Sequence, residues 1–155
     1  MTVNITSPMT GGAQTGFTSP TYTWTADKAP DVNGSQWAAT AFGGTQAGVT
    51  VHSISSPFTL AVFRPKVSAA LPSPNPITGK YGAIPMNRHS VVVRKGVNYA
   101  ANQAPLVAVA RILIDLPAGA DTYDAPNIRA LYSALIGALN QQSAGLGDTG
   151  VSGIL

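Results

Sequence analysis

Few side chains in this sequence could do acid–base or metal chemistry. Histidine occurs only at His52 and His89, glutamate is absent, and all six acidic residues are aspartates. The histidines do not have the spacing of metal ligands, and no serine lies in a G-x-S-x-G turn. Cysteine is also absent, which excludes disulfides and thiolate chemistry. We therefore expect no catalytic site, metal, cofactor or small-molecule substrate, and we interpret His89 as a packed or interface residue.

The basic side chains form a more informative pattern. Residues 1–63 carry a net charge of −1, residues 64–111 carry +7 without one acid, and residues 112–155 carry −3. Only 10% of the chain is charged, whereas soluble domains contain roughly 25%. Such a block indicates an anionic partner such as nucleic acid, although scattered solvated lysines would give the same count. The sparse charge elsewhere indicates a surface that meets other protein.

Three predicted strands must position these charges: residues 57–67, 87–97 and 105–117. Side chains alternate between the two faces of a strand. In the second strand the even positions are the more polar, and in the third Arg111 lies opposite a wholly apolar face. If the strands are neighbours, one side of one sheet carries Arg64, Lys66, Arg88, Ser90, Arg94 and Arg111.

The apolar face of the strand 105–117 needs a cover. Its side chains are Leu106, Ala108, Ala110, Ile112, Ile114 and Leu116. The segment 124–142 repeats apolar residues at the spacing of an amphipathic helix, among them Leu131, Leu135 and Leu139. Asp124 is placed to cap this helix, and Pro126 falls in its first turn. Burial of the stripe is worth several kcal/mol, at about 25 cal/mol per Å², so we expect the helix to be packed.

The rest of the chain predicts strands, loops and a short tail. The patches TYTWTA, SQWAATAF and GVTVHSIS read as short antiparallel strands between turn signals. Four prolines in residues 68–85 indicate an extended loop, and the apolar tail predicts a short helix or an arm. The length fits one domain over residues 1–155. The N-terminus lacks the features of a signal peptide and no apolar run could span a membrane, so we expect a cytosolic protein without a membrane partner.

The order of these features resembles a known family. The stretches NRHSVVVRKGVNYAANQAPLVAVARILIDLP and DAPNIRALYSALIGALN are similar to the last two strands and first C-terminal helix of the coat proteins of single-stranded RNA bacteriophages, the levivirus group. The resemblance runs from about residue 58 to the C-terminus. It implies an α+β fold, with an N-terminal hairpin and early strands in residues 1–57, the main antiparallel sheet in residues 58–117 and two helices in residues 124–155. In this family the helices pack across the partner subunit's sheet in an interlocked dimer.

The resemblance also implies a function. Coat proteins of this family are not enzymes; they dimerise, assemble into an icosahedral shell around viral single-stranded RNA, and can bind an RNA hairpin that represses translation. It implies a protein of the virion that assembles in the bacterial host cytoplasm. The implied RNA-facing residues are Arg64, Lys66, Arg88, Ser90, Arg94 and Arg111. The implied dimer interface comprises Leu106, Ala108, Ala110, Ile112, Ile114, Leu131, Leu135 and Leu139. The implied contacts between dimers lie in the loop of Asn98, Tyr99, Asn102 and Gln103.

Two other classes of protein remain open on the sequence. A small β-rich RNA-binding module would need aromatic residues among the charges of its basic face. The aromatics of this chain lie mostly outside the predicted face. An assembling subunit of another virion type, such as a tailed-phage shell or a fibre, would share the low charge but not the order of sheet and helices. The lack of a tyrosine on the basic face favours non-specific RNA packing over recognition of one hairpin.

Overall fold

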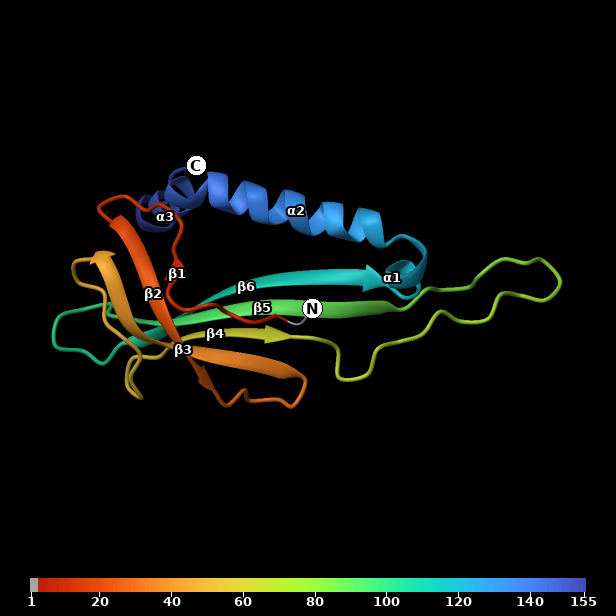
Figure 1. Cartoon of the computed structure of the whole chain (residues 1–155), viewed down its shortest axis with the longest axis horizontal. Helices are drawn as coiled ribbons and strands as arrows, with labels where there is room; N and C mark the ends of the chain where they lie inside the picture. The colour runs from red at the N-terminus through yellow and green to blue at the C-terminus, as the bar shows by residue number, and fades with distance from the viewer. Residues whose placement is uncertain (1–2) are drawn as a thin grey trace.

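A six-stranded antiparallel sheet precedes all the helices of the chain (Figure 1). The computed structural model describes residues 3–155, so the first two residues of the predicted N-terminal segment lie outside the described residues. The strands pair in the order in which they occur along the chain, from β1 to β6. Their bounds are β1 Met9–Thr10, β2 Thr18–Asp27, β3 Gly34–Thr45, β4 Phe58–Phe63, β5 Met86–Val97 and β6 Leu106–Pro117. The predicted fold class, an antiparallel sheet with an N-terminal hairpin and C-terminal helices, is confirmed.

The early strands differ in two places from those predicted. GVTVHSIS is not a strand but part of the loop between β3 and β4. His52 fastens this loop, because its backbone N–H donates to the Ala39 carbonyl at 2.8 Å and its Nδ1 accepts from the Phe58 N–H at 3.0 Å. The strand predicted over residues 57–67 stops at Phe63, two residues before Pro65, which has no N–H for a sheet ladder.

In the part of the chain that the structure describes, three helices follow the sheet: α1 Ala120–Tyr123, α2 Ala125–Gln141 and α3 Ser143–Ser152. Asp124 precedes α2 and Pro126 lies in its first turn, as predicted. The Asp124 side chain does not cap the helix, however, because its carboxylate accepts two hydrogen bonds from Asn127 Nδ2, at 2.9 and 2.7 Å. The short helix α1 is not foreseen by the periodicity. No helix within residues 3–155 is long and apolar enough to cross a membrane.

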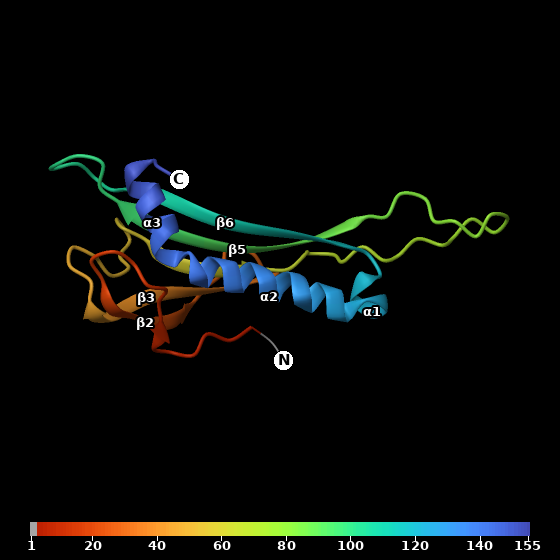
Figure 2. The ribbon, with the colours of Figure 1, turned by 90° about the horizontal axis from the view of Figure 1, so that it is seen from above.

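The core lies on one face of the sheet, across β2, β3 and β4. Its buried residues are Trp24, Trp37, Ala39 and Leu60. Aromatic rings surround them, and the Phe58 ring lies 5.6 Å from the Trp24 ring, edge to face. Residues opposite each other in the sheet extend this face to Val93 of β5 and Ala110 of β6. We call it the helix-side face, because α2 runs along the sheet on that side (Figures 1 and 2).

Helix α2 covers this face only loosely. None of its residues is buried; Tyr132 and Leu135 are half-buried, and Leu131 is 47% exposed. The chain has 10,820 Å² of accessible surface at 15.8 kDa, whereas the trend for folded monomers gives roughly 7,300 Å² at this mass. One subunit therefore leaves uncovered both the helix and the apolar strand that we expected the helix to bury.

Candidate nucleic-acid interface

The register of β5 and β6 fixes which basic side chains share a face. Val92 lies opposite Arg111, and Arg94 lies opposite Val109. Directly opposed residues point to the same side of a sheet. The even positions of β5 and the odd positions of β6 therefore form one face, turned away from the helix side. We call this set the basic face: Arg88, Ser90, Arg94 and Arg111. The predicted grouping of these four residues agrees with the register.

Arg64 does not belong to the basic face. Phe58 of β4 pairs with Lys95 of β5, and Leu60 pairs with Val93. Even positions of β4 thus share a side with odd positions of β5, whereas the predicted grouping requires the even positions of both strands on one side. Arg64 lies just past the end of β4 and lines a cavity on the helix side, together with Tyr132 and Ile136 of α2. Its predicted position with the other arginines is corrected.

Lys66 is also placed elsewhere. It lies in the loop after β4, where its Nζ forms an ion pair with Asp31 Oδ1 at 2.9 Å. Both side chains are exposed, at 65% and 49%, so the pair contributes little to stability. Lys66 is predicted on the basis of strand alternation, but the strand has ended before it is reached. Its grouping with the basic face is corrected as well.

The basic face also contains an acid, Asp115, which alternation places on the same side of its strand as Arg111. Asp115 of β6 lies opposite Arg88. Arg88 Nε and Nη2 donate to the two oxygens of the carboxylate, at 2.7 and 2.9 Å. Hydrogen bonding to Asp115 raises the pKa of Arg88, and the same contact lowers the pKa of Asp115. Part of the positive charge at Arg88 is therefore already matched within the subunit.

Arg94 borders a shallow depression of about 320 Å³ on the same face. Thr59, which lies opposite Arg94, lines it together with Asp27 and Gln36. Gln36 Nε2 donates to Asp27 Oδ2 at 2.7 Å, and this contact is the main cause of the lowered pKa of the Asp27 carboxyl. The depression thus combines a cation with both hydrogen-bond donors and hydrogen-bond acceptors. Within residues 3–155, neither Arg94 nor Arg111 forms an ion pair.

An aromatic ring, that of Phe63, lies beside the basic face. Phe63 of β4 is opposite both Ser90 of β5 and Gly34 of β3. A Cβ atom added at Gly34 would collide with the Phe63 ring, which places the ring on the side of Ser90. Aromatic side chains can stack on unpaired bases. The sequence does not predict Phe63 at this surface, because alternation within β4 leaves its register with β5 open.

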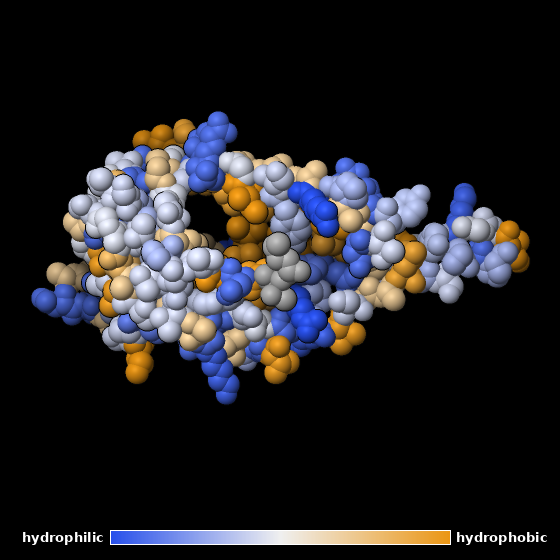
Figure 3. Space-filling view, in the orientation of Figure 1, coloured by the Kyte–Doolittle hydropathy of each residue, from blue (hydrophilic) through white to orange (hydrophobic). Residues whose placement is uncertain are grey.

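The opposite face carries the residues predicted for dimerisation. Leu106, Ala108 and Ala110 of the edge strand β6 are exposed, Ile112 is half-buried, and Ile114 is buried within the subunit at 7% exposure. A cavity of about 480 Å³ separates Ile114 and Val91 of the sheet from Tyr132 and Ile136 of α2. Figure 3 shows a hollow below α2 with hydrophobic side chains at its rim. Leu139 on α2 is also exposed.

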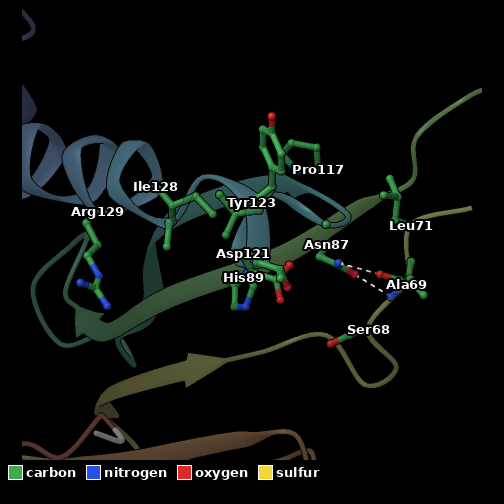
Figure 4. A pocket seen from close by; sticks show the side chains of 15 residues that line it. Ser68, Ala69, Leu71, Asn87, His89, Pro117, Asp121, Tyr123, Ile128 and Arg129 are labelled. Atoms are coloured by element: carbon green, nitrogen blue, oxygen red, sulfur yellow. Dashed lines mark hydrogen bonds between the residues drawn. The ribbon is translucent and has the colours of Figure 1, made fainter. Parts of the chain in front are cut away.

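A second cavity, of about 870 Å³, lies between β5 and the start of α2. His89, Asp121 and Ile128 line it (Figure 4). His89 is half-buried, and its Nδ1 has no hydrogen-bond partner among residues 3–155. At the cavity's outer edge, the Asn87 side chain donates to and accepts from the backbone of Ala69, at 3.0 and 2.8 Å. His89 thus lies on the helix side, in the same cavity as Asp121.

The predicted contact loop connects β5 to β6. All its residues from Asn98 to Ala104 are exposed, and Asn102 has a left-handed φ of 58°. Asparagine tolerates this conformation better than most residues. The loop extends from one end of the sheet, and the Pro-rich loop extends from the other end (Figures 1 and 2).

A known structure of the same fold comes from a virus-like particle. The chain is similar to a chain of the virus-like particle of bacteriophage ESE020, with 55% sequence identity, coverage of 99% of this chain and 100% of that chain, and a TM-score of 0.96. The particle of Wenzhou levi-like virus 4 matches at 18% identity, with 83% and 75% coverage and a TM-score of 0.44. That of Beihai levi-like virus 32 matches at 15%, with 92% and 90% coverage and a TM-score of 0.45. No family model and no curated protein matches the chain.

Proposed function

The chain belongs to the levivirus-like coat proteins of single-stranded RNA bacteriophages, and we propose that it pairs through β6 and packages viral RNA against its basic face. It is a structural protein of the capsid and not an enzyme. The 55% identity to a particle-forming chain over its full length carries the capsid assignment. Dimer geometry, RNA binding and assembly in the cytoplasm of the bacterial host are parts of the proposal.

The edge strand β6 is the reason to propose a pair. It is 12 residues long, and β5 occupies only one of its sides. A long, apolar, unpaired edge attracts other strands unless it is covered. Antiparallel pairing of two β6 strands would satisfy the free backbone groups and join the two sheets into one. In such a pair the helix-side faces of both subunits lie on the same side of the joined sheet. The partner's α2 can then cover Leu106, Ala108 and Ala110.

The surface area supports this pairing. The subunit exposes about 3,500 Å² more than the trend for folded monomers at its mass. Obligate dimers bury roughly 2,000–5,000 Å² in total. The open space between α2 and the sheet, lined by Val91 and Ile136, is where the partner would pack. The unpartnered Nδ1 of His89 lies on that same side and would meet the partner or water there.

The charges support RNA on the other face. Arg94 and Arg111 lie in neighbouring strands and have no ion pair within the described residues. Two joined sheets would repeat these cations in one continuous surface. Cations that contact phosphates release counterions, so such binding weakens steeply with salt. Phosphate contacts carry no sequence information, and we therefore propose packaging first and hairpin recognition with translational repression second.

The depression beside Arg94 is the feature that favours hairpin recognition. Asp27, Gln36 and Thr59 offer hydrogen-bond donors and acceptors within one hollow, as needed to read the edge of an unpaired base. Phe63 lies farther along the same side. Binding of hairpins with altered loops, measured against one salt series, separates the two activities. Equal affinities for all loops would contradict hairpin recognition and retain only RNA packaging.

Expression of the protein in bacteria tests the proposal. We expect dimers on dissociation, measured by light scattering after size exclusion, and closed shells in electron micrographs. Nuclease-protected RNA should copurify with the shells. A uniform monomer would contradict the pairing through β6, and shells of full mass without nucleic acid would contradict the RNA proposal.

A further inference from the structure

The connection between β4 and β5 is a long projection from the sheet. We call its residues 68–85 the arm. Both ribbon views show the arm extending past the ends of the strands, away from the rest of the molecule (Figures 1 and 2). All residues from 73 to 83 are exposed. Near the tip, the Ile77 side chain is 93% exposed and that of Tyr81 is 49% exposed.

The arm has an ordered tip. The Asn75 N–H donates to the Lys80 carbonyl at 2.8 Å, and the Gly79 N–H donates to the Asn75 carbonyl at the same distance. The Asn75 side-chain oxygen accepts from the N–H groups of Ile77 and Thr78, at 2.9 and 3.1 Å. These bonds close a tight turn that holds Ile77 at its outer end. A turn fixed in this way loses little conformational freedom when it binds.

The arm is also stiff and held at its base. Pro72, Pro74 and Pro76 restrict the backbone on the way to the tip. At the base, Asn87 makes two hydrogen bonds with the backbone of Ala69. The arm therefore presents a defined apolar tip at a distance from the sheet, rather than a freely moving chain.

We propose that the tip of the arm docks on a neighbouring copy of this chain, outside the β6 pair, when the shell assembles. Pairing through β6 widens the sheet across the strands, whereas the arm leaves the sheet along the strands. It therefore points beyond the dimer. A closed shell needs contacts at both ends of each subunit, and the loop 98–104 lies at the opposite end.

The composition of the arm favours protein over RNA as its partner. Lys80 is the one charged residue in positions 68–85. A segment that binds phosphates needs several cations. An exposed apolar side chain on a preorganised turn fits a hydrophobic contact with protein. The shell assignment supplies that protein as another copy, and only the statement that the contact is outside the β6 pair depends on the proposed dimer.

Ile77→Asp tests the contact, with Ile77→Val as the matched control. We expect Ile77→Asp to leave the mass and thermal unfolding of the dimer unchanged, because Ile77 is 93% exposed within the subunit. Burying the charge between copies should raise the protein concentration needed for shell assembly by at least about ten-fold. Ile77→Val should assemble at nearly the wild-type concentration. Assembly of Ile77→Asp at the wild-type concentration would overturn the proposal.

A labelling experiment gives an independent readout. The natural chain has no cysteine, so Ile77→Cys introduces the single thiol. We expect maleimide to modify it rapidly in dissociated protein and slowly in intact shells. Equal rates in both states would overturn the proposal, as would protection that is lost in shells emptied of RNA. Loss of dimers in Ile77→Asp would place the contact inside the pair and also contradict it. Monomers of the wild type would contradict the β6 pairing alone, because protection in shells would still report the contact between copies.

Discussion

Arg88 of β5 and Asp115 of β6 lie directly opposite each other, and the guanidinium holds both carboxylate oxygens at 2.7 and 2.9 Å. This pair divides the basic face into two parts. At Arg88 the positive charge is matched by a neighbour on the edge strand. At Arg94 and Arg111 the charge remains available to a ligand from outside the subunit.

Removal of the available charges should weaken RNA binding most. We expect Arg94→Ala with Arg111→Ala to lower the RNA content of purified particles while leaving dimers intact. Loss of two phosphate contacts should reduce the slope of log affinity against log salt by about 1.4, at roughly 0.7 per contact with a single strand. RNA affinity in a salt series is the measurement. Arg88→Ala is the matched comparison and should change the slope less; an equal change would contradict the division of the face.

The Arg88–Asp115 pair should make a small, pH-dependent contribution to stability. The hydrogen bond from Arg88 lowers the folded-state pKa of Asp115 below the ordinary value of 3.8. A lowered carboxyl pKa stabilises the fold above the ordinary value, and this contribution disappears as the pH falls through the folded-state pKa. We expect the melting temperature of the wild type to exceed that of Asp115→Asn at neutral pH. The two values should converge in acid, and a constant difference at all pH values would contradict this origin.

A charge on the apolar stripe of α2 should prevent dimerisation. Leu131 is 47% exposed in one subunit, so Leu131→Asp adds little strain to the isolated chain. In the proposed pair the carboxylate would be buried without a partner, which costs several kcal/mol. We expect the dissociation constant of the dimer to rise by at least about 100-fold. Sedimentation measures it, and circular dichroism checks the fold. Ser133→Asp, on an exposed position of the same helix, is the control and should leave the dimer intact.

Gly44 should be much less replaceable than Gly48. Both have a left-handed backbone, with φ of 70° and 81°. A Cβ added at Gly44 would collide with the backbone carbonyl oxygens of Thr18 and Ser19, whereas one at Gly48 would meet nothing within 4 Å. Gly48→Ala should cost about 1–2 kcal/mol of unfolding free energy from backbone strain alone. Gly44→Ala should cost more than that, because the paired strand must move. Denaturant unfolding measures both, and equal losses would contradict the collision.

Several features of the fold and site follow from local patterns. The alternation in β5 places Arg88 and Arg94 on one side of that strand, because each strand alone decides which of its own side chains share a side. That Arg111 of β6 shares their side depends on the register of the two strands. The helical spacing of apolar residues and the position of Asp124 predict α2 within one residue of its observed start. The charge distribution, which needs no fold at all, indicates an anionic partner.

What the sequence determined by itself is therefore most of the longer elements, among them β5, β6 and α2, and the two sides of each one. The tertiary structure decided how those sides combine. Arg64 left the basic face and Phe63 joined its surroundings because the register between β4 and β5 pairs even positions with odd ones. Lys66 left it because β4 ends at Phe63, and Asp115 lies beside Arg88 through the register of β5 and β6. Register depends on contacts between segments distant in the chain, and a shift of one residue exchanges the two faces. The exposure of α2 is likewise a property of the folded subunit. The periodicity of the helix shows an apolar stripe but not what packs against it.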